Sequence, residues 1–256
     1  MSSSKRIGFL DSGIGGITVL KKAIERLPNE SYVFFSDSKN TPYGDKSDSE
    51  IIKRCTEIVS MLINERDCKA IVIACNTASA KAAKSLREKF AGTPIIAIEP
   101  AYKMVHDIKP KGNTLIMATK GTIKSEKFRR LYYSYYDHHT SIHSFIGLAD
   151  IIEDGNKDKL KEYLNITLAP YKSKVQNVVL GCTHYPLAKK EIAEVLGDVN
   201  FFDGAIGVSR QLEHILNQND IMNNSNETGE VEFIDSSVTE EKRNEKRERF
   251  YKILNS

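Results

Sequence analysis

The sequence lacks the features that carry a protein into or across a membrane. None of its apolar runs approaches the roughly 20 residues that span a bilayer. The chain starts with Met-Ser-Ser-Ser-Lys-Arg and leads directly into a strand-like segment, without the apolar stretch of a signal peptide. We therefore expect a cytoplasmic protein that has no membrane partner.

An excess of charge of one sign is also missing. The 256 residues include 37 basic and 34 acidic side chains, for a formal net charge of +3. This balance does not produce the basic surface of a nucleic-acid-binding protein, so we expect no nucleic-acid partner. With 40% hydrophobic and 28% charged residues, the composition is that of a globular protein with one large domain or two small ones.

Cysteine is scarce, with only four in the chain. A reducing cytoplasm argues against a structural disulfide between them. Cys55 falls in an apolar helical stripe and is interpreted as a small buried hydrophobe, whereas Cys68 carries no clear signal. Cys75 and Cys182 differ, because each comes where an apolar, β-branched run stops and polar residues begin.

Short apolar runs alternate with helical periodicity along most of the chain. This pattern predicts an α/β fold of βαβ units with parallel strands, which are apolar because both faces are covered. Each half has one strand that exits into a polar, glycine-containing turn and a later strand that ends on a cysteine. We interpret this as a weak internal duplication that forms two lobes; chance similarity between βαβ units is the alternative. The expected strands cover residues 6–10, 32–36, 70–74, 95–98, 114–118, 178–181 and 200–202.

The last forty residues are dominated by polar and charged side chains. Residues 217–230 are rich in Asn, Asp, Ser and Glu, which predicts an exposed loop. Ser237-Val-Thr-Glu240 has the pattern of a capping box, so we expect it to open a helix that ends near Leu254. The Glu, Lys and Arg residues of this helix are interpreted as a solvated face.

The first motif that could carry chemistry is the glycine-rich turn that begins at Asp11-Ser12-Gly13. It is not a dinucleotide-binding fingerprint, because Thr18 stands three residues after Gly15, and it has no Gly-Lys-Ser/Thr of a Walker loop. Asp11 would repel phosphate, and would instead accept a proton or hold an ammonium group. The alternative is that the glycines have no role beyond letting the backbone turn sharply, but that interpretation leaves Asp11 and Ser12 unexplained.

The second motif is Cys75-Asn76-Thr77. Open α/β sheets place their sites at the carboxyl ends of strands, which is where this cysteine falls. A helix is expected to start here, and its positive end would favour the thiolate of Cys75. Asn76 and Thr77 offer hydrogen-bond donors that suit a carboxylate.

The third motif is Cys182-Thr183-His184, again at a strand end. His184 would tune the Cys182 thiol or carry its proton. A metal site fits less well, because His138, His139 and His143 lie in a polar stretch without a cysteine or acid partner; we expect no metal. A cysteine hydrolase with His184 as base remains an alternative, but it leaves the second strand-end cysteine unexplained.

Taken together, six motifs resemble the glutamate racemases of the cofactor-independent aspartate/glutamate racemase superfamily. The resemblance implies an α/β fold of two pseudo-symmetric lobes, each a mainly parallel sheet flanked by helices, with the active site in the cleft between them. It implies a first lobe of residues 1–98 with 209–256, a second lobe of residues 99–208, no cofactor, and often a homodimer. The matching motifs cover residues 9–16, 41–44, 74–80, 98–100, 118–122 and 180–187.

The resemblance also implies a set of site residues. Cys75 and Cys182 take the places of the acid/base pair, Asp11 and His184 those of their helpers, and Glu153 that of a supporting acid. The loop at residues 36–40, Ser-Asp-Ser-Lys-Asn, departs from the common Gly-Asp-Thr-Ala-Arg, so substrate access is expected to differ there. Substrate contacts are implied for Asp11, Ser12, Pro42, Tyr43, Gly44, Asn76, Thr77, Thr119, Thr183 and His184.

The expected reaction is the interconversion of L- and D-glutamate, which supplies D-glutamate for peptidoglycan. One cysteine, as thiolate, would remove the α-proton, and the other, as thiol, would protonate the opposite face. Without pyridoxal phosphate as an electron sink, hydrogen-bond donors must hold the carboxylates while negative charge builds. An aspartate racemase of the same superfamily is the alternative that these motifs leave open.

Overall fold

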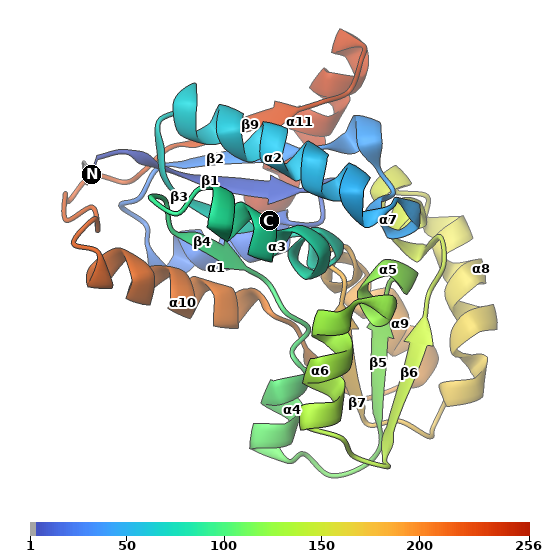
Figure 1. Ribbon diagram of the computed structural model, residues 1–256. Helices are drawn as coiled ribbons and strands as arrows, with labels where there is room; N and C mark the ends of the chain where they lie inside the picture. The colour runs from blue at the N-terminus through green and yellow to red at the C-terminus, as the bar shows by residue number, and fades with distance from the viewer. Residues whose placement is uncertain (1–3) are drawn as a thin grey trace.

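The computed structural model describes residues 4–256 and contains two parallel sheets (Figure 1). Residues 1–3 lie outside the described residues. They are the first residues of the predicted first lobe and of the N-terminal stretch that lacks a signal-peptide pattern. The first sheet has the order β4-β3-β1-β2-β9 and the second β6-β5-β7-β8, and every pairing is parallel. The predicted fold class, two mainly parallel sheets flanked by helices, is confirmed.

The strand bounds agree closely with the expected runs. The first sheet consists of β1 (Arg6–Asp11), β2 (Tyr32–Ser36), β3 (Cys68–Ile73), β4 (Ile95–Ala97) and β9 (Val231–Asp235). The second consists of β5 (Thr114–Ala118), β6 (Thr140–Ser144), β7 (Asn177–Gly181) and β8 (Asn200–Phe202).

Two strands, β6 and β9, escaped the sequence prediction. Both are edge strands, and their side chains are only partly buried in alternation. An edge strand with a solvated face does not form the continuous apolar run that was used to find the buried strands. β9 is the more consequential omission, because it brings the C-terminal part of the chain into the first sheet.

Helices cover both faces of each sheet. Around the first sheet lie α1 (Ile17–Arg26), α2 (Asp48–Asn64), α3 (Asn76–Lys89), α10 (Ala205–Gln218) and α11 (Glu240–Leu254). Around the second lie α4 (Tyr102–Ile108), α5 (Lys120–Lys124), α6 (Glu126–Ser134), α7 (Leu148–Asp154), α8 (Lys157–Leu168) and α9 (Lys189–Leu196). The expected boundary between residues 208 and 209 falls inside α10, which packs against α1.

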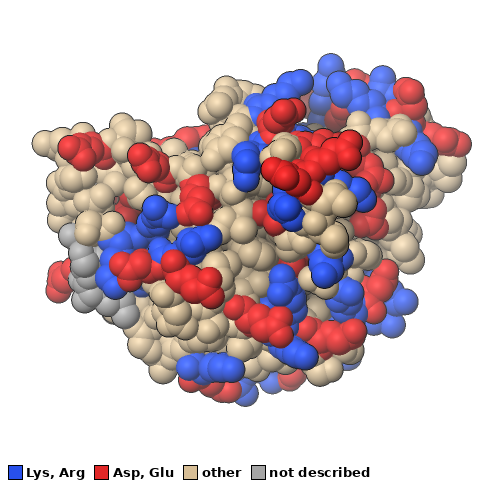
Figure 2. Space-filling model, turned by 90° about the horizontal axis from the view of Figure 1, so that it is seen from above, with Lys and Arg blue, Asp and Glu red and all other residues tan. Residues whose placement is uncertain are grey.

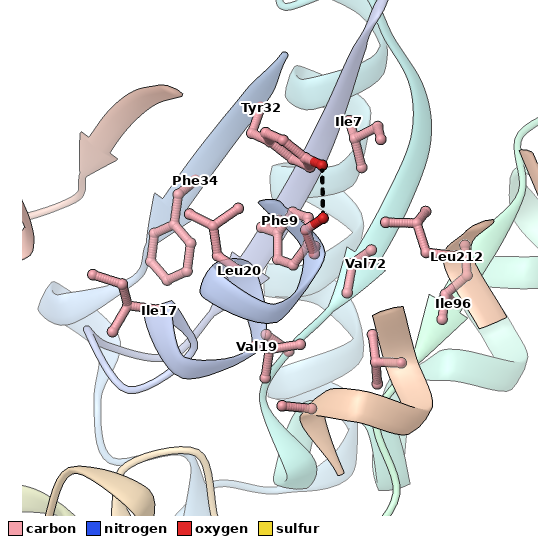
Figure 3. Close-up of a cluster of buried hydrophobic side chains, with 14 of the residues drawn as sticks. Ile7, Phe9, Ile17, Val19, Leu20, Tyr32, Phe34, Val72, Ile96 and Leu212 are labelled. Carbon is pink, nitrogen blue, oxygen red and sulfur yellow. Dashed lines mark hydrogen bonds between the residues drawn. The ribbon is translucent and has the colours of Figure 1, made fainter. Parts of the chain in front are cut away.

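The core of the first sheet shows why its strands fold as they do. Phe9, Tyr32 and Phe34 point to one face, where they pack against Leu20 of α1 (Figure 3). The Tyr32 hydroxyl is buried with them and donates to the backbone oxygen of Leu27 at 2.7 Å, which removes the penalty for an unpaired polar group. The opposite face is covered by α2 and α3. The sheet is therefore covered by packed side chains on both faces.

The C-terminal predictions need two corrections. Ser237 does not cap α11; Thr239 does, and its hydroxyl accepts from the Lys242 amide at 3.4 Å. The segment 217–230 is not exposed throughout, because Ile221 is buried and the Asn223 amide donates to Glu30 at 2.8 Å. Composition alone did not show these contacts with distant residues.

The surface reflects the near balance of charge. Basic and acidic side chains lie side by side over the face shown in Figure 2. Among residues 4–256, no helix has both the length and the apolar character that crossing a membrane requires.

Candidate active site

One cavity collects the residues that follow the carboxyl ends of β1, β3, β5 and β7. The strand registers align these ends, with Leu10 of β1 level with Ile73 of β3, and Ala118 of β5 level with Gly181 of β7. The cavity has a volume of about 60 Å³. The predicted site residues that line it are Ser12, Pro42, Tyr43, Gly44, Cys75, Asn76, Thr77, Thr119, Cys182, Thr183 and His184.

Sequence reasoning missed other residues of the wall. They come from the loop before α2, from the start of α5 and from the segment that leads into α7. From the segment after β6, sequence analysis named Glu153 but none of the residues that line the cavity. The additional lining residues are Thr41, Asp45, Lys120, Phe145, Ile146, Gly147, Ala149 and Asp150.

A larger hollow, of about 810 Å³, lies elsewhere, between β4, α4 and α10. It is lined by residues such as Glu99, Lys103 and Asp203, and it contains none of the predicted site residues. Size therefore does not identify the site here; the convergence of thiols, amide and hydroxyls does.

Cys75 sits between β3 and α3 and caps the helix. Its sulfur accepts from the Ala78 amide at 3.4 Å and donates to the Ser12 hydroxyl at 3.5 Å. Burial, reinforced by the charge of Asp11, raises the pKa of Cys75 to about 12, although the contacts with Ser12 and Ala78 lower it. The expected effect of the helix start is present, because the Ala78 amide lowers the pKa, but burial outweighs it and the net shift favours the thiol.

Cys182 follows β7 and starts a chain of polar contacts. Its sulfur lies 3.9 Å from His184 Nδ1, and His184 Nε2 lies 2.7 Å from Glu153 Oε2. Burial would lower the pKa of His184, but the hydrogen bonds to Cys182 and Glu153 and the charge of Glu153 raise it well above its ordinary value. Burial likewise opposes ionisation of Glu153, yet His184 and Lys246 lower its pKa overall. His184 is thus held as an imidazolium against a carboxylate.

Asp11 is completely buried and is not among the residues that line the cavity. Its carboxylate accepts from the Gly16 amide at 3.0 Å and from the Thr183 hydroxyl at 3.2 Å. Burial raises the pKa of Asp11 to about 6, although His184 and the turn amides lower it. Asp11 therefore affects Cys75 through its charge and bonds directly to Thr183 of the other cysteine motif.

The glycines of the first motif permit a close approach. A β-carbon on Gly15 would lie 2.6 Å from His184 Nδ1 and 2.7 Å from the backbone nitrogen of His184. One on Gly13 would lie 2.7 Å from Glu153 Oε2. Between them, the Ile14 amide donates to Glu153 Oε2 at 2.9 Å. The turn needs glycine because it packs directly against the His184–Glu153 pair, a reason that local sequence does not reveal.

Asn76 is the clearest candidate for holding a ligand. It is buried and lines the cavity, and neither its Oδ1 nor its Nδ2 has a hydrogen-bond partner within residues 4–256. Buried polar groups in folded proteins are almost always paired, so an unpaired amide in a cavity wall marks a place where a ligand donates and accepts.

Thr77 and Thr119 join the two halves of the cavity. Their hydroxyl oxygens lie 2.9 Å apart, and Thr122 approaches both, at 3.4 Å from Thr77 and 3.0 Å from Thr119. Thr77 belongs to α3 on the first sheet, whereas Thr119 caps α5 on the second. Their hydroxyls are therefore available to one ligand from both sides.

Tyr43 is positioned by the loop that departs from the family pattern. Its hydroxyl donates to Asp37 at 2.7 Å. Asp37 is buried and also accepts from Arg54 of α2, at 2.8 and 3.0 Å, and these hydrogen bonds lower its pKa despite burial. Asp37 and Arg54 thus hold the Tyr43 side chain in place; sequence analysis named Asp37 only as part of the loop 36–40 and did not name Arg54.

The last helix contributes two cations that were also missed. Lys246 forms an ion pair with Glu153, and Arg249 Nη2 donates to the backbone oxygen of Ile152 at 2.6 Å. The interpretation of the charged face of α11 as merely solvated is wrong for these two residues. Helical spacing shows which residues share a face but not what that face meets.

The histidines outside the cavity also need a correction. Asp137 directly precedes His138 and His139, and one ligand atom from each lies within 4.8 Å of the others, so an acid partner does exist. All three side chains are exposed. His143 lies in β6, where it packs edge-on against Phe145. The expected absence of a metal stays a prediction.

Comparison with known proteins places this chain near one family of enzymes. The family model described as Asp/Glu/Hydantoin racemase matches residues 16–208. A glutamate racemase from Clostridium perfringens (strain SM101) is 41% identical over 235 residues, 90% of each chain. A crystal structure of a glutamate racemase isoform from Bacillus anthracis gives a TM-score of 0.84 at 29% identity, covering 98% of this chain and 95% of that one. Another, from Francisella tularensis in complex with D-glutamate, gives 0.80 at 29% identity, with coverage of 98% and 94%.

Proposed function

Because the chain belongs to the Asp/Glu/Hydantoin racemase family, we propose that it is a glutamate racemase that inverts the α-carbon by two-cysteine acid/base chemistry. One observation carries the proposal: Cys75 of the first sheet and Cys182 of the second line the same cavity. Relatives that share this fold are named glutamate racemases, and one of them was crystallised with D-glutamate.

The two thiols start in different surroundings. Cys75 rests as a buried thiol, which suits the proton donor. The Cys182 sulfur lies 3.9 Å from His184 Nδ1, a partner through which it can exchange a proton, which suits the base. In one direction of the reaction, Cys182 takes the α-proton from one face of the α-carbon and Cys75 delivers a proton to the opposite face. The reverse reaction exchanges these roles.

The remaining wall must stabilise the carbanion. An α-proton next to a carboxylate is very weakly acidic, so charge that builds on the carboxylate needs fixed donors. The Asn76 amide has no hydrogen-bond partner among the described residues, and the Thr77 and Thr119 hydroxyls, 2.9 Å apart, line the same cavity. The Ser12 hydroxyl completes the set, whereas the Thr183 hydroxyl already donates to Asp11. Asp11 acts from behind the wall, because it orients Thr183 and fixes the turn against α1.

We further infer the setting in which this reaction serves the cell. The expected role is the supply of D-glutamate for peptidoglycan, carried out in the cytoplasm by a homodimer. This inference rests on the likeness to glutamate racemases over 90% of the chain. Sedimentation of the purified protein checks the dimer, and rescue of a deletion strain by added D-glutamate checks the role.

The reaction itself is tested with the purified protein and no added cofactor. L-glutamate and L-aspartate are incubated in parallel, and the enantiomers are separated by chiral chromatography. We expect L-glutamate to approach a 1:1 mixture while L-aspartate stays unchanged. Inversion of aspartate alone would make the protein an aspartate racemase. Inversion of neither would leave a binding protein or a cysteine hydrolase.

A further inference from the structure

Three separate parts of the chain meet at the Glu153 carboxylate. Oε2 faces His184 Nε2 at 2.7 Å and accepts from the Ile14 amide at 2.9 Å. Oε1 is ion-paired with Nζ of Lys246, which belongs to α11. His184 contacts Cys182, so Lys246 lies at the end of a continuous polar chain that leads to a reacting sulfur.

The position of Lys246 is fixed by the first sheet. Phe250, one turn further along α11, is completely buried and stacks on Phe233 of β9, with ring centroids 4.4 Å apart. It also packs on Phe34 of β2, at 5.1 Å. Residues four apart share one helix face, so this anchor holds Lys246 toward α7.

Arg249 fixes the backbone to which Glu153 belongs. Its guanidinium donates to the backbone oxygens of Ile152 and Glu153, at the end of α7. The last carbonyls of a helix lack intrahelical partners, and a basic side chain satisfies them. Arg249 therefore holds the main chain of α7 while Lys246 holds the carboxylate.

The contact between Lys246 and Glu153 differs from an ordinary surface ion pair. Exposed pairs contribute little, because water screens them and both side chains lose freedom. Here the Glu153 side chain is only 6% exposed and that of Lys246 20%. A carboxylate buried to this degree without a fixed cation would carry a large desolvation penalty, so the lysine has a structural reason to stay in place.

We propose that Lys246 is a positioning residue of the active site, which fixes the Glu153 carboxylate against His184 and offsets its negative charge. The proposal deepens the proposed function and rests on it, since His184 matters to catalysis only if Cys182 does. Lys246 does not line the cavity, so it acts through Glu153.

The balance of charge around His184 gives the proposal a measurable consequence. Without Lys246 the negative charge of Glu153 is no longer offset, so His184 holds its proton more tightly and its pKa rises. The titratable and charged groups that face His184 are Asp11 of β1, Asp150 and Glu153 of α7, Cys182 after β7 and, through Glu153, Lys246 of α11.

The test compares the full-length protein with Lys246→Met, Lys246→Arg and Lys252→Met. Lys252 is an exposed lysine of the same helix and controls for loss of one charge from α11. The titration of His184 is followed by NMR of isotope-labelled histidine, with thermal unfolding as a check of folding. In parallel, kcat and KM for L-glutamate are measured.

We expect Lys246→Met to raise the pKa of His184 and to lower kcat about 10-fold, less than the roughly 10²-fold that a 1 Å misplacement of a catalytic group costs. Lys246→Arg should restore both, and Lys252→Met should change neither. An unshifted His184 titration in folded Lys246→Met, or an equal shift in Lys252→Met, would overturn the proposal. The titration needs no substrate, so it decides this point even if the wild-type protein does not racemise glutamate.

Discussion

A single methyl group added at Gly15 should disrupt the site by pressing against His184. The added β-carbon would lie 2.6 Å from His184 Nδ1 and 2.7 Å from the backbone nitrogen of His184, whereas ordinary contacts begin near 3.4 Å. The deficit is therefore about 0.8 Å, taken from those two distances. A rotation of the imidazole cannot relieve it, because the backbone atom is equally close.

The magnitude follows from what holds His184 in place. The residue is buried, and its Nε2 is tied to Glu153 at 2.7 Å, so the clash must displace the histidine backbone or the turn. Overpacking of a tight site destabilises a protein by roughly 1–3 kcal/mol. A catalytic group displaced by about 1 Å loses on the order of 10²-fold in rate. We expect Gly15→Ala to show both effects.

The assay combines urea unfolding with the racemisation rate per folded molecule. Gly207→Ala is the matched control, because Gly207 lies in α10 and its β-carbon would meet nothing within 4 Å. Alanine in a helix is favoured over glycine by up to about 1 kcal/mol, so this variant should be slightly more stable and fully active. If Gly15→Ala kept wild-type activity, the close packing of the turn on His184 would not be a requirement of the site.

Two further predictions concern stability. Lys69 and Glu30 form a 2.6 Å ion pair whose side chains are 0% and 1% exposed. Lys69→Met should therefore lower the free energy of unfolding, measured by urea titration, by roughly 3–5 kcal/mol. A loss below about 1 kcal/mol, the size expected for an exposed pair, would contradict this. For Asp11, whose pKa is raised from 3.8 to about 6, the unfolded chain releases its proton first as pH rises. Wild-type stability relative to Asp11→Asn should therefore fall by about 2 kcal/mol between roughly pH 4 and pH 6, and parallel pH curves would refute it.

The buried strands could be predicted because their sequences carry the pattern of their surroundings. The expected runs at 32–36 and 114–118 coincide with the buried strands β2 and β5, and the run at 200–202 coincides with the short edge strand β8. β6 and β9 could not be found in this way, since one face of each edge strand is open to water and the run is broken by polar residues. Turn and cap chemistry was equally ambiguous, as the shift of the α11 cap from Ser237 to Thr239 shows.

The candidate site was accessible from sequence where polar residues directly follow a strand. Cys75 and Cys182 stood out for this reason, and the structure places both on one cavity. The partners of these residues come from far along the chain: Glu153 meets His184 across 31 positions and Lys246 across 93. No local pattern encodes such meetings, because they depend on how the two sheets pack.

Charge states were the least predictable property. The position of Cys75 at a helix start suggested a thiolate, yet burial raises its pKa to about 12. Whether the pKa of a cysteine rises or falls depends on how completely its sulfur is removed from water, and burial is a property of the whole fold. The sequence shows which residues are neighbours along the chain, but groups that raise the pKa of Cys75, such as Asp11, come from another strand.

Two thiols that act on opposite faces of one carbon must both be needed for inversion. The direct measurement is incubation of L- and D-glutamate in deuterated water with the wild type, Cys75→Ala, Cys182→Ala and the control Cys68→Ala, which alters the other end of β3. The wild type and Cys68→Ala should form the opposite enantiomer with deuterium at the α-carbon. Each site variant should lose inversion by about 10²- to 10⁴-fold. Inversion at the wild-type rate by either Cys75→Ala or Cys182→Ala would contradict a two-cysteine mechanism.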